Sequence, residues 1–182
     1  MLQITEQGWC KEAMIIPSPN QDARPDNVSV ELLVLHHISL PQGRFGGDDV
    51  VALFTNTLDS QAHPDYVLLH KLRVSAHFFI QRQGNVIQFV ACNRRAWHAG
   101  VSCWQGRKQC NDFSIGIELE GHEYTPYTEA QYSALKHLIT ELRQCYPIQH
   151  IVGHQDIAPE RKTDPGPFFD WRRVYAHWAA GC

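Results

Sequence analysis

Short apolar runs separated by helical patterns constrain the fold of this chain more than any other feature of its sequence. Residues 31–37 (ELLVLHH) and 150–154 (HIVGH) are too short for helices and end abruptly, which is typical of buried strands. Residues 114–121 (SIGIELEG) alternate between two faces with a period of two residues, as a strand does. The sequence therefore predicts three short strands, each of which needs a partner in a sheet.

Helix signals stand between and after these strands. Thr128 and Gln131 have the spacing of a capping box, and the residues after them carry an apolar stripe at helical spacing up to Pro147. Asp48 and Asp170 are each followed by apolar residues at helical spacing, so each predicts the start of a further helix. Strands that alternate with helices favour a sheet with helices packed on it.

The middle of the chain predicts a hairpin followed by irregular structure. Residues 73–80 and 86–90 flank a turn at residues 83–85, which is the arrangement of a β-hairpin. Residues 91–112 show no regular period and form a candidate lid. A length of 182 residues suits one folded unit. We therefore expect a single α/β domain over residues 1–182, with a central sheet on which helices pack.

Composition argues against several classes of partner. The net charge is −3 and no basic stripe occurs, which argues against a nucleic-acid partner. No apolar run approaches the roughly 18 residues of a membrane helix, and the first residues lack the pattern of a secretion signal. We therefore expect a cytoplasmic protein with no membrane contact. Because the cytoplasm is reducing, we expect reduced thiols at Cys10, Cys92, Cys103, Cys110, Cys145 and Cys182, none of which forms a C-x-x-C pair.

The segment GHQDIAPERKTDPGP, near the end of the chain, carries a candidate metal site. It brings His154, Lys162 and Asp164 into one stretch rich in proline and glycine. Imidazole and carboxylate are zinc ligands, and His36 or His37, at the end of an earlier strand, supplies a third donor. Two imidazoles and one carboxylate leave a fourth tetrahedral position open, as catalytic zinc requires. Packed core histidines are the alternative, because the donors lie far apart in the sequence.

Groups that move protons or stabilise charge are available as well. Lys162 can meet negative charge that develops during hydrolysis. Glu118 lies on the strand face opposite the apolar residues of SIGIELEG, and a carboxylate near a metal can transfer protons. Glu120 shares that face, so strand alternation does not separate the two glutamates. An exposed strand glutamate without a catalytic role is the alternative.

Other polar and aromatic residues are weaker candidates. His77 lies within an apolar run, where a packed and hydrogen-bonded histidine is the usual case. The loop Trp97-His98-Ala99-Gly100 can line a pocket, although ordinary packing of the tryptophan is the alternative. Arginine binds carboxylates through paired N–H donors, although most arginines are simply solvated. The arginines considered for a carboxylated peptide are Arg73, Arg95, Arg107 and Arg161.

Five segments of the chain resemble a known family. They are VLHHISLP, LRVSAHFFI, RAWHAGVS, CNDFSIGIELEG and GHQDIAPERKTDPGP, in the order seen in the zinc N-acetylmuramoyl-L-alanine amidases. The similarity extends from about Gly8 to Trp171, nearly the whole chain. The resemblance implies a mixed central sheet with flanking helices, a fold shared with phage amidases and peptidoglycan recognition proteins.

The resemblance also implies roles for individual residues. His36, His154 and Asp164 match the zinc ligands of the family. Glu118 matches the catalytic acid and base, and Lys162 matches the lysine that stabilises the oxyanion. The implied reaction is hydrolysis of the amide between the lactyl group of N-acetylmuramic acid and L-alanine. Family members bind the muropeptide with loops that correspond to those around Arg73, Trp97, Arg107 and Arg161.

The expected compartment narrows the substrate that the resemblance implies. A cytoplasmic member meets soluble 1,6-anhydro-N-acetylmuramyl peptides, with or without N-acetylglucosamine, during peptidoglycan recycling, and does not reach the intact wall. No protein partner is implied. Two alternatives remain: a module that binds peptidoglycan without cutting it, and a cysteine–histidine hydrolase that uses Cys92 or Cys103.

Overall fold

A computed structural model describes residues 2–180, and each of the three apolar runs forms a strand in it. The strands are β1 (Met14–Ile15), β2 (Gln21–Ala23), β3 (Leu32–Ile38), β4 (Phe78–Ile80), β5 (Val86–Gln88), β6 (Arg94–Ala96), β7 (Cys103–Trp104), β8 (Arg107–Lys108), β9 (Ser114–Glu120) and β10 (His150–Gly153). The helices are α1 (Asp49–Phe54), α2 (Tyr66–Leu69), α3 (Glu129–Cys145), α4 (His154–Ile157) and α5 (Trp171–Ala180), with a 3₁₀ turn at Cys110–Asp112.

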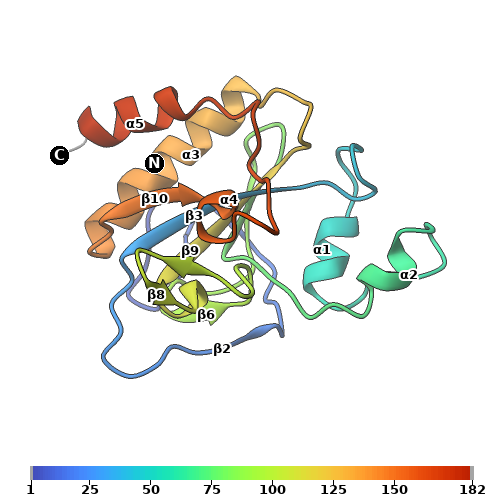
Figure 1. Ribbon diagram of the computed structural model, residues 1–182, viewed down its shortest axis with the longest axis horizontal. Coiled ribbons are helices and arrows are strands. Elements are labelled where there is room, and N and C mark those ends of the chain that lie inside the picture. The colour runs from blue at the N-terminus through green and yellow to red at the C-terminus, as the bar shows by residue number, and fades with distance from the viewer. Residues whose placement is uncertain (1, 181–182) are drawn as a thin grey trace.

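Within the described residues, a six-stranded sheet in the order β1-β5-β4-β9-β3-β10 forms the centre of the molecule (Figure 1). Neighbouring strands from β4 to β10 run parallel, whereas β5 pairs antiparallel with β4. The sheet is therefore mixed, as the resemblance described above implies. The expected hairpin is present but shorter than predicted, because Ser75 donates its backbone N–H to the Trp97 carbonyl (3.1 Å) before β4 begins.

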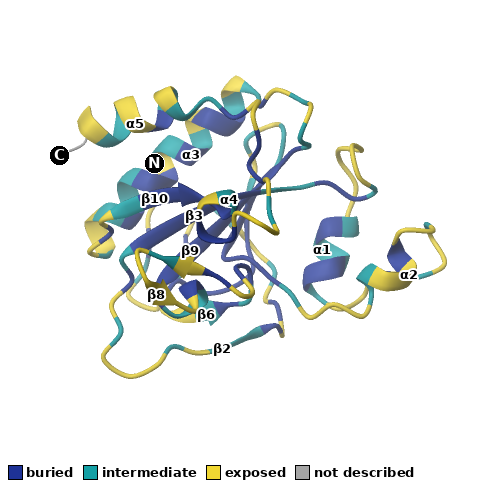
Figure 2. Ribbon diagram, viewed as in Figure 1, coloured by how far each residue is buried: buried dark blue, intermediate teal, exposed yellow. Residues whose placement is uncertain are grey.

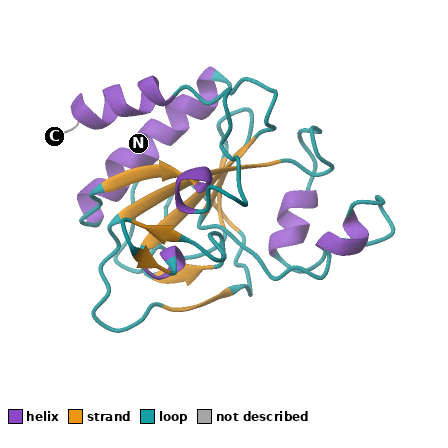
Figure 3. Ribbon diagram, viewed as in Figure 1, coloured by secondary structure: helices purple, strands orange, loops and turns teal. Residues whose placement is uncertain are grey.

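One face of the sheet packs against two helices. Helices α3 and α5 lie side by side on this face (Figures 1 and 3). Between them and the strands lies the largest apolar cluster, and the strands appear as buried elements within it (Figure 2). Its buried members from the strands include Leu33, Leu35, Ile115, Ile117 and Leu119, and those from α3 include Tyr132, Leu135, Leu138, Ile139 and Leu142. The apolar stripe predicted for this helix is therefore confirmed.

The opposite face is covered by the segment predicted to be irregular. Residues 91–112 contain β6, β7, β8 and the 3₁₀ turn, elements of only two or three residues, which are too short to leave a periodic signal. Ala99 and Cys110 from this segment pack with Val34 and Val152 of the sheet, and neither has measurable exposure. Part of the segment thus packs against the sheet, whereas residues 105–109 are exposed.

Helices α1 and α2 form a third group beside β4 and β5, at the right of Figure 1. Helix α1 ends at Phe54, earlier than the apolar spacing predicts, because Asn56 adopts a positive φ of 62° that interrupts the helix. Asp48 precedes α1 but makes no side-chain cap bond. Asp170 does cap α5 as predicted, since its Oδ1 accepts the Arg172 N–H at 3.1 Å.

The structure also shows the state of the cysteines and the character of the helices. Within the described residues, Cys10, Cys92, Cys103, Cys110 and Cys145 are free thiols, and Cys182 lies outside that range. Among residues 2–180, no helix combines the length and apolar character that crossing a membrane requires.

Thr128 caps α3 through the predicted capping box. Its Oγ1 accepts the Gln131 N–H at 3.1 Å, and the Gln131 side chain accepts the Thr128 N–H at 3.1 Å. We expect Thr128→Ala to lower the free energy of unfolding by about 1 kcal/mol, because the helix loses an N-terminal acceptor. Urea unfolding measures this, with Thr128→Ser as the matched control that keeps the hydroxyl. Equal midpoints for the alanine and serine variants would contradict the prediction.

Candidate metal centre and active site

The register of the parallel strands aligns the predicted residues in one row. His36 of β3 lies opposite Glu118 of β9, and Leu35 lies opposite Gly153, the last residue of β10. His154 follows directly, so it stands beside His36 at the carboxyl ends of the strands. Ligand sites in α/β sheets form at such ends. The predicted strand at residues 150–154 stops one residue early, because the Asp156 carboxylate accepts the Gly153 N–H (2.7 Å) and starts α4.

Asp164 reaches this row from the loop that follows α4. Its Oδ2 lies 3.1 Å from Nδ1 of His36 and 3.1 Å from Nδ1 of His154, and the two Nδ1 atoms are 3.0 Å apart. All three side chains are buried, and each offers one donor atom to a common point. A tetrahedral ion with bonds of about 2.0–2.1 Å separates its ligands by about 3.3 Å. The triangle therefore fits a single metal ion.

The structure decides between the two adjacent histidines. His36 belongs to the triangle, whereas His37 lines the neighbouring cavity, and its buried Nε2 has no hydrogen-bond partner among the described residues. Burial, with His154 beside it, lowers the pKa of His36 to about 4. Burial lowers the pKa of His37 as well. His36 is therefore neutral near pH 7, which is the state in which imidazole binds a metal.

The two glutamates of β9 are both buried but differ in their partners. Glu120 is held by the backbone, because its carboxylate accepts the N–H groups of Arg82 (2.9 Å) and Gly46. Glu118 lines the cavity, and its Oε2 has no partner among the described residues. Burial raises the pKa of Glu118 well above its ordinary value, the Asp164 charge adds to this, and Lys162 opposes it. Glu118 is therefore buried rather than exposed, and its Oε2 atom is available to exchange a proton with a molecule in the cavity.

A cavity of about 620 Å³ opens over this row. Its lining includes the polar side chains of His36, Glu118, His154, Lys162 and Asp164. It also includes the apolar or aromatic side chains of Leu40, Leu53, Phe54, Leu68, Leu69, Leu72, Val74 and Trp97. The predicted metal and acid–base residues therefore converge on one space that is large enough for a small peptide or sugar.

The candidate arginines do not line this cavity: Arg73, Arg95, Arg107 and Arg161. Arg107 forms an ion pair with Glu31 (3.3 Å) and borders a different cavity. Arg161 donates to the carbonyls of Ala99 and Val101, both at 2.8 Å, and so supports the loop behind the site. Trp97 is the one member of the predicted substrate-contact group, among the residues described, that lines the cavity.

Two buried histidines lie behind the row. His77 is packed, as predicted, and its Nδ1 accepts the Gly116 N–H at 3.0 Å. His98, from the loop expected to line a pocket, does line the cavity, and its Nδ1 also contacts Nε2 of His36 at 2.9 Å, which the sequence did not predict. A Cβ on Gly116 would lie 2.4 Å from Cγ of His98, so only glycine leaves room for this ring. In the sequence, Gly116 is the one sign that a group packs closely against this strand, but a glycine does not reveal which ring that group is.

Comparison with known proteins gives consistent results. A family model described as N-acetylmuramoyl-L-alanine amidase matches residues 26–167. The chain is 55% identical over 172 residues to the 1,6-anhydro-N-acetylmuramyl-L-alanine amidase AmpD of Escherichia coli (strain K12), covering 93% of this chain and 94% of that protein. A crystal structure of a selenomethionine AmpD derivative superposes with a TM-score of 0.93 at 53% identity, covering 96% of this chain and 99% of that chain.

A more distant solved structure carries a bound substrate. It is the N-acetylmuramyl-L-alanine amidase AmiD from E. coli in complex with anhydro-N-acetylmuramic acid-L-Ala-D-gamma-Glu-L-Lys. It is 27% identical, with a TM-score of 0.63, and the match covers 97% of this chain and 65% of that chain. The fold described above is therefore that of proteins that act on muramyl peptides.

Proposed function

Because the chain belongs to the N-acetylmuramoyl-L-alanine amidase family, we propose that it hydrolyses the amide between the lactyl group of 1,6-anhydro-N-acetylmuramic acid and L-alanine. The observation that carries this proposal is the convergence of His36, His154 and Asp164 below a cavity that also contains an unpartnered Glu118 carboxyl. The substrates are soluble anhydromuramyl peptides of peptidoglycan recycling, and the compartment is the cytoplasm. Relatives that carry this substrate in their names support the choice.

Zinc is the metal that we propose for this centre. Two imidazoles and one carboxylate are a ligand set of catalytic zinc sites, and three protein ligands leave one position for water or substrate. Zinc held there supplies Lewis acidity, which polarises the carbonyl and lowers the pKa of water. The short contacts among the three donor atoms support a single small ion.

Glu118 is the proposed proton carrier. It stands beside His36 in the same row of the sheet and faces the cavity with no competing hydrogen bond to Oε2 among the described residues. It accepts the proton of the attacking water and delivers it to the departing alanine nitrogen, so that the amine leaves in neutral form. The apolar side chains of the cavity lining, Trp97 among them, pack against the substrate and limit the access of other water.

Lys162 is proposed to stabilise the negative charge that develops on the carbonyl oxygen. Its side chain lines the same cavity as Glu118 and Asp164. We expect Lys162→Met to lower kcat by about 10²–10³, because one charge-stabilising donor is lost, with a much smaller change in KM. Steady-state kinetics on a defined anhydromuropeptide measure this, with Lys108→Met on the exposed β8 strand as control. Equal losses in the two variants would exclude this role.

Mass spectrometry of an incubated anhydromuramyl tripeptide tests the function as a whole. We expect separate masses for the free peptide and the anhydro sugar, and slow release from intact sacculi. A substrate whose mass stays intact would instead identify a binding module. Activity that survives chelation but is lost on thiol alkylation would identify a cysteine hydrolase. That outcome is disfavoured because burial raises the pKa of Cys92, and neither Cys92 nor Cys103 lines the cavity.

A further inference from the structure

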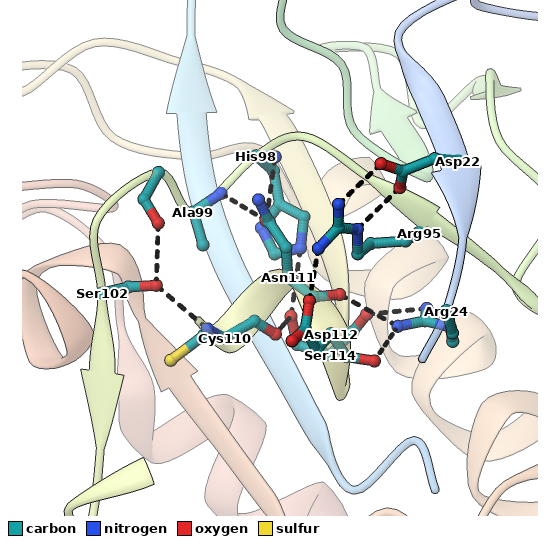
Figure 4. Close-up of polar contacts among 11 residues, drawn as sticks. Asp22, Arg24, Arg95, His98, Ala99, Ser102, Cys110, Asn111, Asp112 and Ser114 are labelled. Atoms are coloured by element: carbon teal, nitrogen blue, oxygen red, sulfur yellow. Dashed lines mark hydrogen bonds and ion pairs between the residues drawn. The ribbon is translucent and has the colours of Figure 1, made fainter. Parts of the chain in front are cut away.

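A chain of buried hydrogen bonds runs from His36 away from the candidate metal centre. Nε2 of His36 contacts Nδ1 of His98 at 2.9 Å, and Nε2 of His98 contacts Oγ of Ser114 at 3.1 Å. Ser114 in turn donates its hydroxyl proton to the Cys110 carbonyl at 2.6 Å. Figure 4 shows His98, Ser114 and Cys110 in this arrangement. All four residues are buried, so water does not compete for these bonds.

The Cys110 carbonyl, at the end of this series of hydrogen bonds, determines which atom donates and which accepts in each bond. The Cys110 carbonyl can only accept, so the single hydroxyl proton of Ser114 is committed to it. The Ser114 oxygen must then accept from Nε2–H of His98. A neutral imidazole carries one N–H, so Nδ1 of His98 is unprotonated and accepts from Nε2–H of His36. Nδ1 of His36 is therefore left without a proton.

A second and shorter chain acts on the other histidine. Nε2 of His154 lies 3.2 Å from the Ala99 carbonyl, which again can only accept. Nε2 of His154 therefore carries a proton, and in the neutral imidazole, the form that binds a metal, its Nδ1 is bare. Arg161 donates to the same carbonyl (2.8 Å) and keeps it in place. Adjacent residues of one loop, His98 and Ala99, thus determine the protonation pattern of both histidines.

The consequence concerns the triangle of donor atoms. If both Nδ1 atoms are bare, the 3.0 Å contact between them cannot be a hydrogen bond, and neither can their 3.1 Å contacts with the Asp164 carboxylate. Three lone pairs then face one another with no proton between them. Such an arrangement is unfavourable until a cation occupies it.

We propose that the loop at His98 and Ala99, together with Ser114, is a positioning device that holds His36 and His154 in the Nε2–H tautomer and so prepares both Nδ1 atoms for the metal. This inference rests on the proposed metal site. Outer partners of this kind orient ligands and raise their basicity. Neither His98 nor Ser114 touches the donor triangle directly, so each acts through His36.

The loop is itself held from two sides. Oδ1 of Asn111 accepts the backbone N–H groups of His98 (3.1 Å) and Ala99 (2.8 Å), as Figure 4 shows. Arg24 donates to the carbonyls of Asn111 and Ser114 at 3.0 and 2.8 Å. The His98 ring lies against Gly116, where a Cβ would block it. Because these contacts fix the His98 ring in place, the donor and acceptor roles in the hydrogen-bond series stay the same.

Zinc affinity provides the first test. We expect His98→Leu, which removes the acceptor for His36, to weaken zinc binding by about 10–100-fold in competition with a chromophoric chelator. His98→Asn keeps an acceptor oxygen at the δ position and should recover part of the affinity. His77→Leu removes another buried imidazole, one that lies outside this series of hydrogen bonds, and should weaken zinc binding less than His98→Leu does. Equal affinities of His98→Leu and wild type overturn the inference.

The second test needs no variant. Nitrogen-15 NMR of the metal-free wild-type protein should show His36 and His154 in the Nε2–H tautomer, and any folded His98→Leu protein should shift His36 toward Nδ1–H. A wild-type His36 with Nδ1–H overturns the inference even if the variants do not fold. Wild-type protein that binds no zinc overturns the proposed function, and the tautomers of the metal-free protein then still decide the inference.

Discussion

Glu118→Gln protein is expected to bind zinc as wild type does and to lose turnover by about 10²–10⁴, the usual contribution of general acid–base catalysis. The amide keeps the shape of the side chain but cannot accept the proton of the attacking water. The Oε2 atom that changes has no hydrogen-bond partner among residues 2–180, so the substitution breaks no internal bond at that atom. We therefore expect the free energy of unfolding to stay the same or to rise, since the ionised form of Glu118 is disfavoured by burial.

The neighbouring glutamate provides the matched control. The Glu120 carboxylate accepts the backbone N–H groups of Arg82 and Gly46. Glu120→Gln replaces one accepting oxygen with an NH₂ group, which then faces one of these N–H donors. We expect Glu120→Gln to lower the free energy of unfolding and to leave the kcat of the folded protein unchanged. Single-turnover release of peptide, measured beside zinc content and urea unfolding, separates the two variants. Wild-type turnover in Glu118→Gln would remove Glu118 from the mechanism.

Removal of the metal is the second change with a large expected effect. Chelator-treated protein should show no measurable release of peptide, and added zinc should restore it. Zinc should also stabilise the fold, by about 4 kcal/mol at a thousandfold excess over its dissociation constant, because it binds the three converged donors only in the folded chain. Thermal unfolding with and without zinc measures this difference.

Asp164→Ala tests whether the effect of zinc comes from this site. The variant lacks one of the three donors, and we expect its melting temperature to lose most of its dependence on zinc. It should also be inactive at zinc concentrations that saturate wild type. Full activity of stripped wild-type protein, or an unchanged zinc-dependent shift in Asp164→Ala, would show that catalysis does not use this triangle.

Local signals in the sequence were sufficient where the structure depends on short-range patterns. The capping box at Thr128 and Gln131 and the apolar stripe after it both appear in α3, because helix capping and amphipathic packing involve residues three or four positions apart. The strand at residues 114–121 is present for a similar reason, since its alternation reports which side chains face α3.

Features that depend on contacts between residues far apart in the sequence could not be predicted in this way. Both His36 and His37 were candidates from the sequence, and the choice depended on the pairing of β3 with β10, which places His36 beside His154. Glu118 and Glu120 share a strand face and differ only in which distant backbone N–H groups reach them. The link between His98 and His36 was not predicted, because it depends on contacts of a loop residue with side chains from two strands, β3 and β9.

The amino-acid sequence by itself determined the residue types of the site, the strands that end at it and the family to which the chain belongs. These follow from local periodicity and from motifs whose order along the chain is specific. The tertiary structure alone decided which of two adjacent histidines joins the donor triangle, which glutamate keeps a free carboxyl, and which nitrogens lack a proton. The physical reason is that strand register and buried hydrogen-bond direction depend on groups that only folding brings together.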